Sequence, residues 1–237
     1  MLNENYLIRP SMPIGKNVST FMLSKKFFQQ YPENKITRQN YHALLETLIN
    51  LPIVQLNQVH GNKISEVIKR GSVLIKNSDG VYTKSPNLVL TIKTADCLPL
   101  ILSSEDGREI LALHIGWRGL YKDIIDRALQ LLESKLEEVT AWLGPSISSK
   151  NYLVGKDVYD SFLKSDKKSF SSFKKATTKD KWLFSLRDEA CRRLKENGIK
   201  TITSEICTYE DKESFFSYRR DGTSERMITL VWRNNEK

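Results

Sequence analysis

Along the chain, short apolar runs are interspersed with a few longer stretches in which apolar residues recur at helical spacing among polar ones. The apolar runs are bounded by Gly, Asn, Asp, Pro and Ser, a pattern typical of strands. They lie at residues 53–59, 64–68, 79–83, 88–92, 98–102, 110–115, 139–143, 201–207 and 227–232. Apolar residues three and four positions apart predict helices instead. These stretches lie at residues 37–50, 119–136, 157–163 and 186–196.

Strands outnumber helices in this pattern, and some of them follow one another as hairpins. This mixture favours an α+β fold, with mixed sheets sandwiched between helices. A chain of 237 residues can bury a substantial core, and no Pro- or Gly-rich linker divides it. We therefore expect residues 1–237 to form a single domain.

The clearest chemistry in the sequence lies at the two ends of one predicted hairpin, within residues 94–119. Ser, Asp and Gly between the runs at 98–102 and 110–115 predict a tight turn. Because that turn joins the strands at one end, their other ends lie side by side. Cys97 comes just before the first strand and His114 lies near the end of the second. A thiol and an imidazole are thus expected at the same sheet edge.

His60 adds a second imidazole, because it follows the predicted strand at residues 53–59 and precedes a Gly-Asn turn. His60, Cys97 and His114 form a donor set that suits zinc and leaves a fourth position open, as catalytic zinc sites do. Two alternatives remain from the residues alone. The thiol and imidazoles could be buried structural groups, or Cys97 and a histidine could form a nucleophilic pair without metal. The third histidine, His42, falls within a predicted helix, and we expect its side chain to be structural or solvated.

Two arginine-containing turns are candidates for anion binding. Arg118 lies between Gly116 and Gly119 where a strand passes into a helix, and its guanidinium could bind phosphate or carboxylate in a bidentate manner. Residues 218–222, Tyr-Arg-Arg-Asp-Gly, could likewise form an anion clamp. An ordinary strand-to-helix turn and a charged hairpin tip are the alternatives.

The composition indicates a globular protein, and the distribution of charge argues against a nucleic-acid-binding one. The chain is 40% hydrophobic and 27% charged, which is typical of a globular protein rather than a disordered one. Residues 164–181 hold seven lysines and two aspartates, which account for +5 of the net charge of +9. This local cluster predicts a solvated, flexible loop rather than a nucleic-acid surface. Three widely spaced cysteines, with no signal peptide and no membrane-spanning run, predict a cytoplasmic protein that contacts no membrane.

Five motifs, taken in order, resemble the YfiH family, whose members are described as laccase-domain purine nucleoside phosphorylases and were earlier labelled polyphenol oxidases. The motifs are QVHG (58–61), TADCLP (94–99), HIGWRG (114–119), LGPSI (143–147) and FFSYRRDG (215–222). The resemblance implies a four-layer sandwich of two mixed sheets flanked by helices. It also implies a zinc ion held by His60, Cys97 and His114.

The resemblance further implies phosphorolysis of adenosine, inosine and 5′-methylthioadenosine to the base and (methylthio)ribose 1-phosphate, together with adenosine deamination. Small-molecule purine nucleosides and phosphate would be the partners, and the chemistry of Arg118 makes it the candidate for phosphate. Tyr41, Leu153 and Ser185 stand where the family commonly has other residues. A copper-dependent, laccase-like polyphenol oxidase is less favoured, because such sites use more histidines than the chain contains. A non-catalytic metal-binding protein is the remaining alternative.

Overall fold

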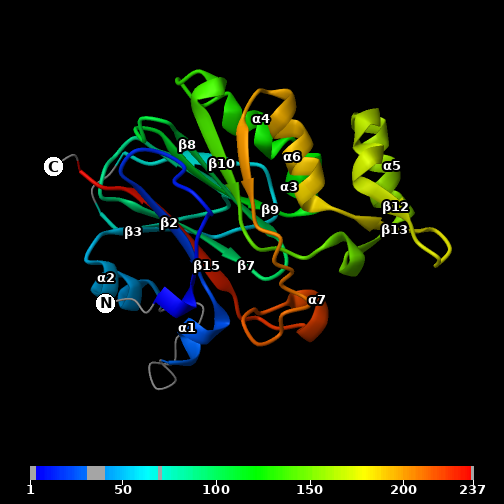
Figure 1. Ribbon diagram of the computed structural model, residues 1–237, viewed down its shortest axis with the longest axis horizontal. Coiled ribbons are helices and arrows are strands. Elements are labelled where there is room, and N and C mark those ends of the chain that lie inside the picture. Colours follow the sequence, from blue (N-terminus) through cyan, green and yellow to red (C-terminus); the bar gives the residue numbers. More distant parts are fainter. Residues whose placement is uncertain (1–3, 31–40, 69–70, 236–237) are drawn as a thin grey trace.

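The computed structural model describes residues 4–30, 41–68 and 71–235, and it contains two large mixed sheets that pack face to face (Figure 1). The first has the strand order β1-β2-β15-β7-β3-β5. Its strands are β1 (Leu7–Ile8), β2 (Val18–Leu23), β3 (Ile53–Leu56), β5 (Val73–Ile75), β7 (Val89–Thr94) and β15 (Met227–Arg233). Parallel pairs join β3 to β5 and β7, while the other neighbours are antiparallel.

The second sheet has the order β14-β10-β8-β9-β6-β4. Its strands are β4 (Ile64–Glu66), β6 (Gly80–Thr83), β8 (Leu98–Ser104), β9 (Ile110–Ile115), β10 (Val139–Leu143) and β14 (Lys200–Thr203). The predicted hairpin is β8 and β9, joined through a turn in which Gly107 has a φ of 72°. Pro99 pairs with His114, so the predicted juxtaposition of Cys97 and His114 at one sheet edge is confirmed.

Three separate hydrophobic clusters show that the molecule has four layers. One cluster lies between the sheets, where Met22 and Leu90 of the first sheet pack with Ile101 and Trp142 of the second. Another fills the space between the second sheet and the helices α3 (Trp117–Tyr121), α4 (Ile124–Leu129), α5 (Lys156–Ser165) and α6 (Leu186–Glu196). The third lies beneath α1 (Lys25–Gln29) and α2 (Tyr41–Ile49), on the outer face of the first sheet. The expected sandwich of two mixed sheets between helices is confirmed (Figure 1).

The predicted helix at 119–136 is wrong in its length. The chain forms α3 and α4 with a break at Asp123, whose φ of 60° is left-handed and cannot continue a helix. The Asp123 carboxylate accepts a hydrogen bond from Arg193 of α6 at 2.9 Å, which holds the break in place. The predictions for α5 and α6 are confirmed. The helix predicted at 37–50 is α2, and residues 37–40 lie outside the described part of the chain.

The flexible loop predicted at 164–181 is also wrong, although all seven of its lysines are exposed as expected. The segment contains the 3₁₀ helix η5 (Lys167–Ser172) and the strand β12 (Phe173–Lys175). A third, small sheet joins β12 to β13 (Lys181–Phe184) and β11 (Leu153–Gly155). Buried Glu189 of α6 accepts hydrogen bonds from Ser169 and Ser172, each at 2.9 Å. These few buried polar contacts order a segment whose composition is that of a loop.

Smaller differences concern the ends of elements. The strand predicted at 201–207 ends at Thr203, and Cys207 forms only an isolated bridge with Ser146. Residues 218–222 form the short helix α7 (Tyr218–Asp221) rather than a hairpin tip. The remaining 3₁₀ turns are η1 (Glu4–Tyr6), η3 (Leu136–Glu138) and η4 (Ser149–Asn151). Across residues 4–30, 41–68 and 71–235, helices are too short or too polar to cross a membrane.

Candidate active site

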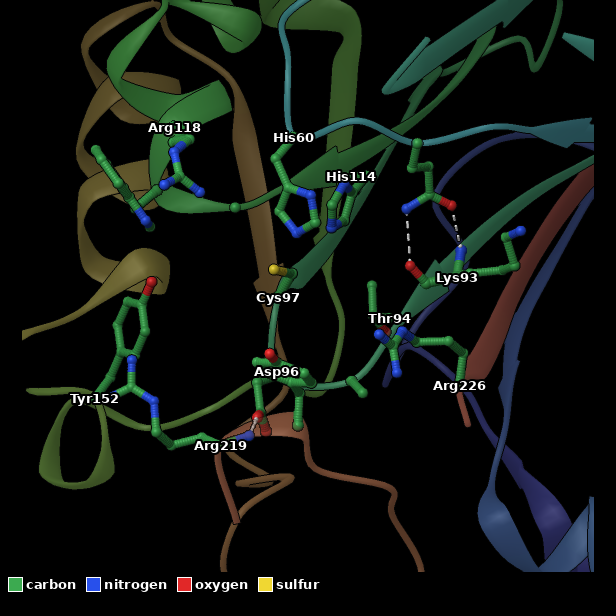
Figure 2. A pocket seen from close by; sticks show the side chains of 15 residues that line it. His60, Lys93, Thr94, Asp96, Cys97, His114, Arg118, Tyr152, Arg219 and Arg226 are labelled. Carbon is green, nitrogen blue, oxygen red and sulfur yellow. Dashed lines mark hydrogen bonds between the residues drawn. The ribbon is translucent and has the colours of Figure 1, made fainter. Parts of the chain in front are cut away.

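The structure brings His60, Cys97 and His114 together, as the sequence predicts. One donor atom from each residue lies within 4.8 Å of the others, and the centres of the two imidazole rings are 4.7 Å apart (Figure 2). His114 belongs to β9 and is 3% exposed, Cys97 precedes β8, and His60 lies in the exposed loop after β3. The cluster therefore has a fixed, buried side and an open side.

Asp79, which immediately precedes β6, organises both histidines. Its Oδ1 accepts a hydrogen bond from the backbone N–H of His60 at 2.9 Å and lies 2.7 Å from the Nδ1 of His114. Its Oδ2 accepts from the N–H groups of Val59 and Gly61, at 3.1 and 2.7 Å. The carboxylate is fully buried, so these partners replace its hydration.

Gln58 fixes the other side of the loop that bears His60. Its side-chain amide donates to the carbonyl of Lys93 at 2.8 Å and accepts from the N–H of the same residue at 2.9 Å. Figure 2 shows both hydrogen bonds. Since Lys93 lies in β7, Gln58 connects the loop to the first sheet, while Asp79 connects it to the second.

Two glycines of the His-Ile-Gly-Trp-Arg-Gly segment are required by close packing around the cluster. A Cβ on Gly116 would lie 3.1 Å from the His60 ring and 3.3 Å from the Cys97 sulfur. A Cβ on Gly119 would lie 2.6 Å from the Gly61 carbonyl oxygen, which is closer than any real Cβ contact. A side chain at position 119 would therefore displace the loop of His60, while one at position 116 would need the His60 ring or the Cys97 sulfur to give way slightly.

The electrostatics of the cluster favour a thiolate. Burial alone would raise the pKa of Cys97, but the charge and hydrogen bonds of His114 and His60 outweigh it and lower the pKa to about 6. Burial opposes protonation of His114, while the negative charge on Cys97 and the hydrogen bond to Asp79 raise its pKa to about 9. A thiolate and imidazoles are the protein groups that bind zinc and other soft or borderline metals. The donor set therefore fits a metal ion.

A cavity of about 610 Å³ opens on the exposed side of the cluster. Its walls carry guanidinium groups and aromatic rings, and they come from segments far apart in the sequence (Figure 2). The cationic and aromatic residues lining it are Lys93, Trp117, Arg118, Tyr152, Tyr218, Arg219 and Arg226. Arg118 is exposed, and its guanidinium lies 4.7 Å from the centre of the Trp117 ring. Such a wall suits a small molecule that combines a flat ring with an anionic group.

Asp96 holds α7 against the cavity. Its carboxylate accepts hydrogen bonds from the side chains of Thr208 and Ser217, at 2.8 and 2.9 Å, and from the backbone N–H of Arg219 at 2.6 Å. The Arg219 guanidinium then lies over the Tyr152 ring at 4.9 Å. Arg220 faces away and donates to backbone carbonyls, so of the two arginines of α7 it is Arg219 that lines the cavity.

Comparison with known proteins identifies the family. The family model described as multi-copper polyphenol oxidoreductase laccase matches residues 29–234. A relative from Escherichia coli named purine nucleoside phosphorylase YfiH is 36% identical over 77% of this chain and 75% of its own length. The chain belongs to the YfiH family. Another family member, from Haemophilus influenzae and named purine nucleoside phosphorylase, is 33% identical over 95% of this chain and 98% of its own length.

Solved structures agree with the YfiH fold. A crystal structure of a Neisseria meningitidis protein superposes with a TM-score of 0.86 at 25% identity, covering 97% of this chain and 100% of that protein. YlmD from Geobacillus stearothermophilus, at 21% identity, has a TM-score of 0.83 and covers 99% of this chain and 98% of its own. The four-layer sandwich is therefore shared.

The resemblance marks three positions as departures from the family pattern, and their surroundings in the structure differ. Leu153 offers its backbone carbonyl to the Arg219 guanidinium at 2.9 Å, a contact that any side chain at this position permits. Ser185 caps α6 by accepting a hydrogen bond from the N–H of Asp188. Tyr41 is buried on α2, and the Lys93 ammonium lies 5.8 Å from its ring centre. None of these three side chains lines the 610 Å³ cavity.

Asp79 and Asp96 are the site residues that the sequence patterns do not reveal. Asp79 occurs in a Ser-Asp-Gly run, which is typical of a turn before a strand, and Asp96 lies within the Thr-Ala-Asp-Cys motif. The backbone of Asp96, however, marks it as unusual once the structure is seen. Its φ of 89° is an unusual conformation for a residue other than glycine, and such conformations cluster at functional sites.

Proposed function

We propose that the protein is a zinc-dependent purine nucleoside phosphorylase that also deaminates adenosine. The main support for this proposal is the metal-competent cluster of His60, Cys97 and His114, which lies in the wall of a cavity also lined by Arg118. The relatives named purine nucleoside phosphorylase supply the substrate class. Adenosine, inosine and 5′-methylthioadenosine are the proposed substrates.

Zinc is the proposed metal because one thiolate and two imidazoles form a typical catalytic zinc set with an open fourth position. Multicopper oxidases need several histidine-rich copper sites, and this chain has three histidines, of which His42 lies on α2 away from the cluster. When bound, zinc supplies a Lewis acid beside the cavity. The small number of histidines therefore argues against a multicopper oxidase and supports zinc as the proposed metal.

Phosphorolysis requires an anionic oxygen to be held beside the C1′ carbon of the nucleoside. In the described chain the Arg118 guanidinium has no hydrogen bond or ion pair, so its donors are available to phosphate. A phosphate oxygen forms a bond to C1′, the C1′–N9 bond breaks, and its electron pair leaves with the base, which then takes up a proton. The products are the free base and ribose 1-phosphate. The role of Arg118 is to bind and orient phosphate.

The base has flat surfaces to pack on. The rings of Trp117, Tyr152 and Tyr218 line the same cavity, and purines stack readily on aromatic side chains. Deamination needs no phosphate, because water adds at C6 of adenine and ammonia leaves. One nucleoside pocket can thus serve both reactions, and they differ in their dependence on Arg118.

The direct test is to incubate the purified protein with inosine, with and without phosphate. We expect hypoxanthine and ribose 1-phosphate to form in equal amounts, and only when phosphate is present. Adenosine without phosphate should yield inosine and ammonia. Oxygen consumption with a phenol, in place of these products, would favour the copper oxidase. A metal-loaded protein without turnover would favour a binding protein.

We also propose that residues 1–237 act as one domain. Pairing of β2 with β15 connects the two ends of the described chain within one sheet, and this supports the proposal. Cytoplasmic location and the lack of membrane or nucleic-acid partners stay predictions from the sequence.

A further inference from the structure

We propose that Asp79 is the positioning residue of the metal centre and that it sets both histidine ligands through a single carboxylate. This inference rests on the metal site proposed above and assigns a role to a residue that does not itself reach the cavity. The role follows from what each carboxylate oxygen contacts and from the way the backbone of Asp79 is held.

The ring of His114 is fixed by Asp79 at two points. The Nδ1 atom lies 2.7 Å from Oδ1 of Asp79, and the backbone N–H of His114 donates to the Asp79 carbonyl, also at 2.7 Å. With Nδ1 engaged in this way, Nε2 is the ring nitrogen left for a metal. A carboxylate on the far nitrogen fixes the tautomer and makes the ligating nitrogen more basic.

The conformation of His60 is fixed by the same carboxylate. His60 has a φ of 59°, in the left-handed region that side-chain-bearing residues rarely adopt. Three successive N–H groups, from Val59, His60 and Gly61, point at the Asp79 oxygens. This arrangement holds the loop in the turn that directs His60 toward Cys97 and His114.

A neutral isostere cannot replace this carboxylate. Four donors converge on the two oxygens of Asp79, counting the three N–H groups and the Nδ1–H of His114. Asparagine has one acceptor oxygen, and its NH₂ group would face the remaining donors. In Asp79→Asn, either the tautomer of His114 or the conformation of the His60 loop should therefore no longer be fixed, although the side chain keeps its size.

The first experiment compares zinc affinity, by competition with a chromogenic chelator, in the full-length protein and two variants. Asp79→Asn should bind zinc about 10- to 100-fold more weakly, which is the usual effect of removing such a partner. Asp106→Asn is the matched control, because Asp106 accepts hydrogen bonds in the turn at the opposite end of the β8–β9 hairpin, and its affinity should not change. Cobalt substitution adds a readout of ligand geometry, since the cobalt absorption bands should shift only in Asp79→Asn.

The outcomes separate this inference from the proposed function. An unmodified protein that binds no zinc would contradict both. Zinc binding by the unmodified protein, with Asp79→Asn within about twofold of it and the same cobalt spectrum, would overturn the role of Asp79 alone.

A second experiment needs no variant of Asp79 and so does not depend on how that variant folds. The chain has three histidines, so ¹⁵N-histidine spectra of the zinc-loaded protein are simple, and His42→Ala assigns the ring that lies on α2. We expect His114 to carry a proton on Nδ1 and to ligate zinc through Nε2. Ligation through Nδ1, or an Nδ1 without a proton, would overturn the proposal.

Discussion

The carboxylate of Asp96 accepts a hydrogen bond from the backbone N–H of Arg219, 123 residues later in the chain, at 2.6 Å. Asp96 directly precedes Cys97, and Arg219 lies on the cavity wall over Tyr152. One residue therefore fixes the position of α7 relative to the metal-competent cluster. This contact explains why the Thr-Ala-Asp-Cys and Ser-Tyr-Arg-Arg-Asp segments, remote in sequence, form one site.

Asp96→Asn should weaken substrate binding without removing the metal. The amide cannot accept all three hydrogen bonds that the carboxylate accepts, so α7 should move away from the cavity. We expect the KM for inosine to rise about tenfold, which corresponds to the loss of one hydrogen bond to a charged group. Zinc content, measured by mass spectrometry, should be unchanged. Asp221→Asn, an exposed change on the same helix, is the control, and loss of zinc in Asp96→Asn would contradict this role.

Arg118→Ala should separate the two proposed reactions. Removing the guanidinium should raise the KM for phosphate about 10- to 100-fold, the range expected for hydrogen bonds to a charged group. Adenosine deamination, which uses water, should change far less. Arg118→Lys should restore only part of the loss, because lysine lacks the planar fork. Equal loss of both reactions would instead show that Arg118 braces the turn into α3.

The buried carboxylate of Glu189 should make the free energy of unfolding depend on pH in the acid range. Burial raises the pKa of its carboxyl, but hydrogen bonds and charge from Arg192 and Arg193 outweigh burial and hold the pKa below its usual value. A depressed folded-state pKa stabilises the fold above the ordinary glutamate pKa of about 4.3, and this contribution is lost as pH falls through the lower folded value. Glu189→Gln should reduce the free energy of unfolding at pH 7 by about 3 kcal/mol, because two arginines lose their buried partner.

Urea unfolding at a series of pH values measures this effect. The difference between the unmodified protein and Glu189→Gln should shrink as the pH falls below about 4. Glu196→Gln is the control, because this half-exposed partner of Arg192 should contribute less than about 1 kcal/mol. A Glu189→Gln variant as stable as the control variant would show that the buried network around Glu189 contributes little to the free energy of unfolding.

The sequence predicts the features of the site that depend on local pattern. The turn between β8 and β9 contains Asp106 and Gly107, and it determines which strand ends meet. The local pattern alone therefore places Cys97 and His114 together. The strand ahead of His60 and the helix α6 are likewise set by short-range periodicity.

Other features depend on contacts between distant residues, which no local pattern encodes. Asp79 meets His114 only because β6 pairs with β9, and Asp96 meets Arg219 across most of the chain. The break at Asp123 interrupts an otherwise regular apolar stripe because one residue takes a left-handed φ and pairs with Arg193. The composition of 164–181 indicates exposure of its lysines, while its order comes from Glu189 on another element.

The metal content of the purified protein shows whether His60, Cys97 and His114 hold zinc. We predict about one zinc and negligible copper per chain when no metal is added during purification. Cys97→Ser and His114→Ala should each lose the zinc and remain folded, while Cys191→Ala on α6 should keep it, at a cost of about 1 kcal/mol in stability. Stoichiometric copper, or zinc retained in full by Cys97→Ser, would show that these three residues do not form a zinc site.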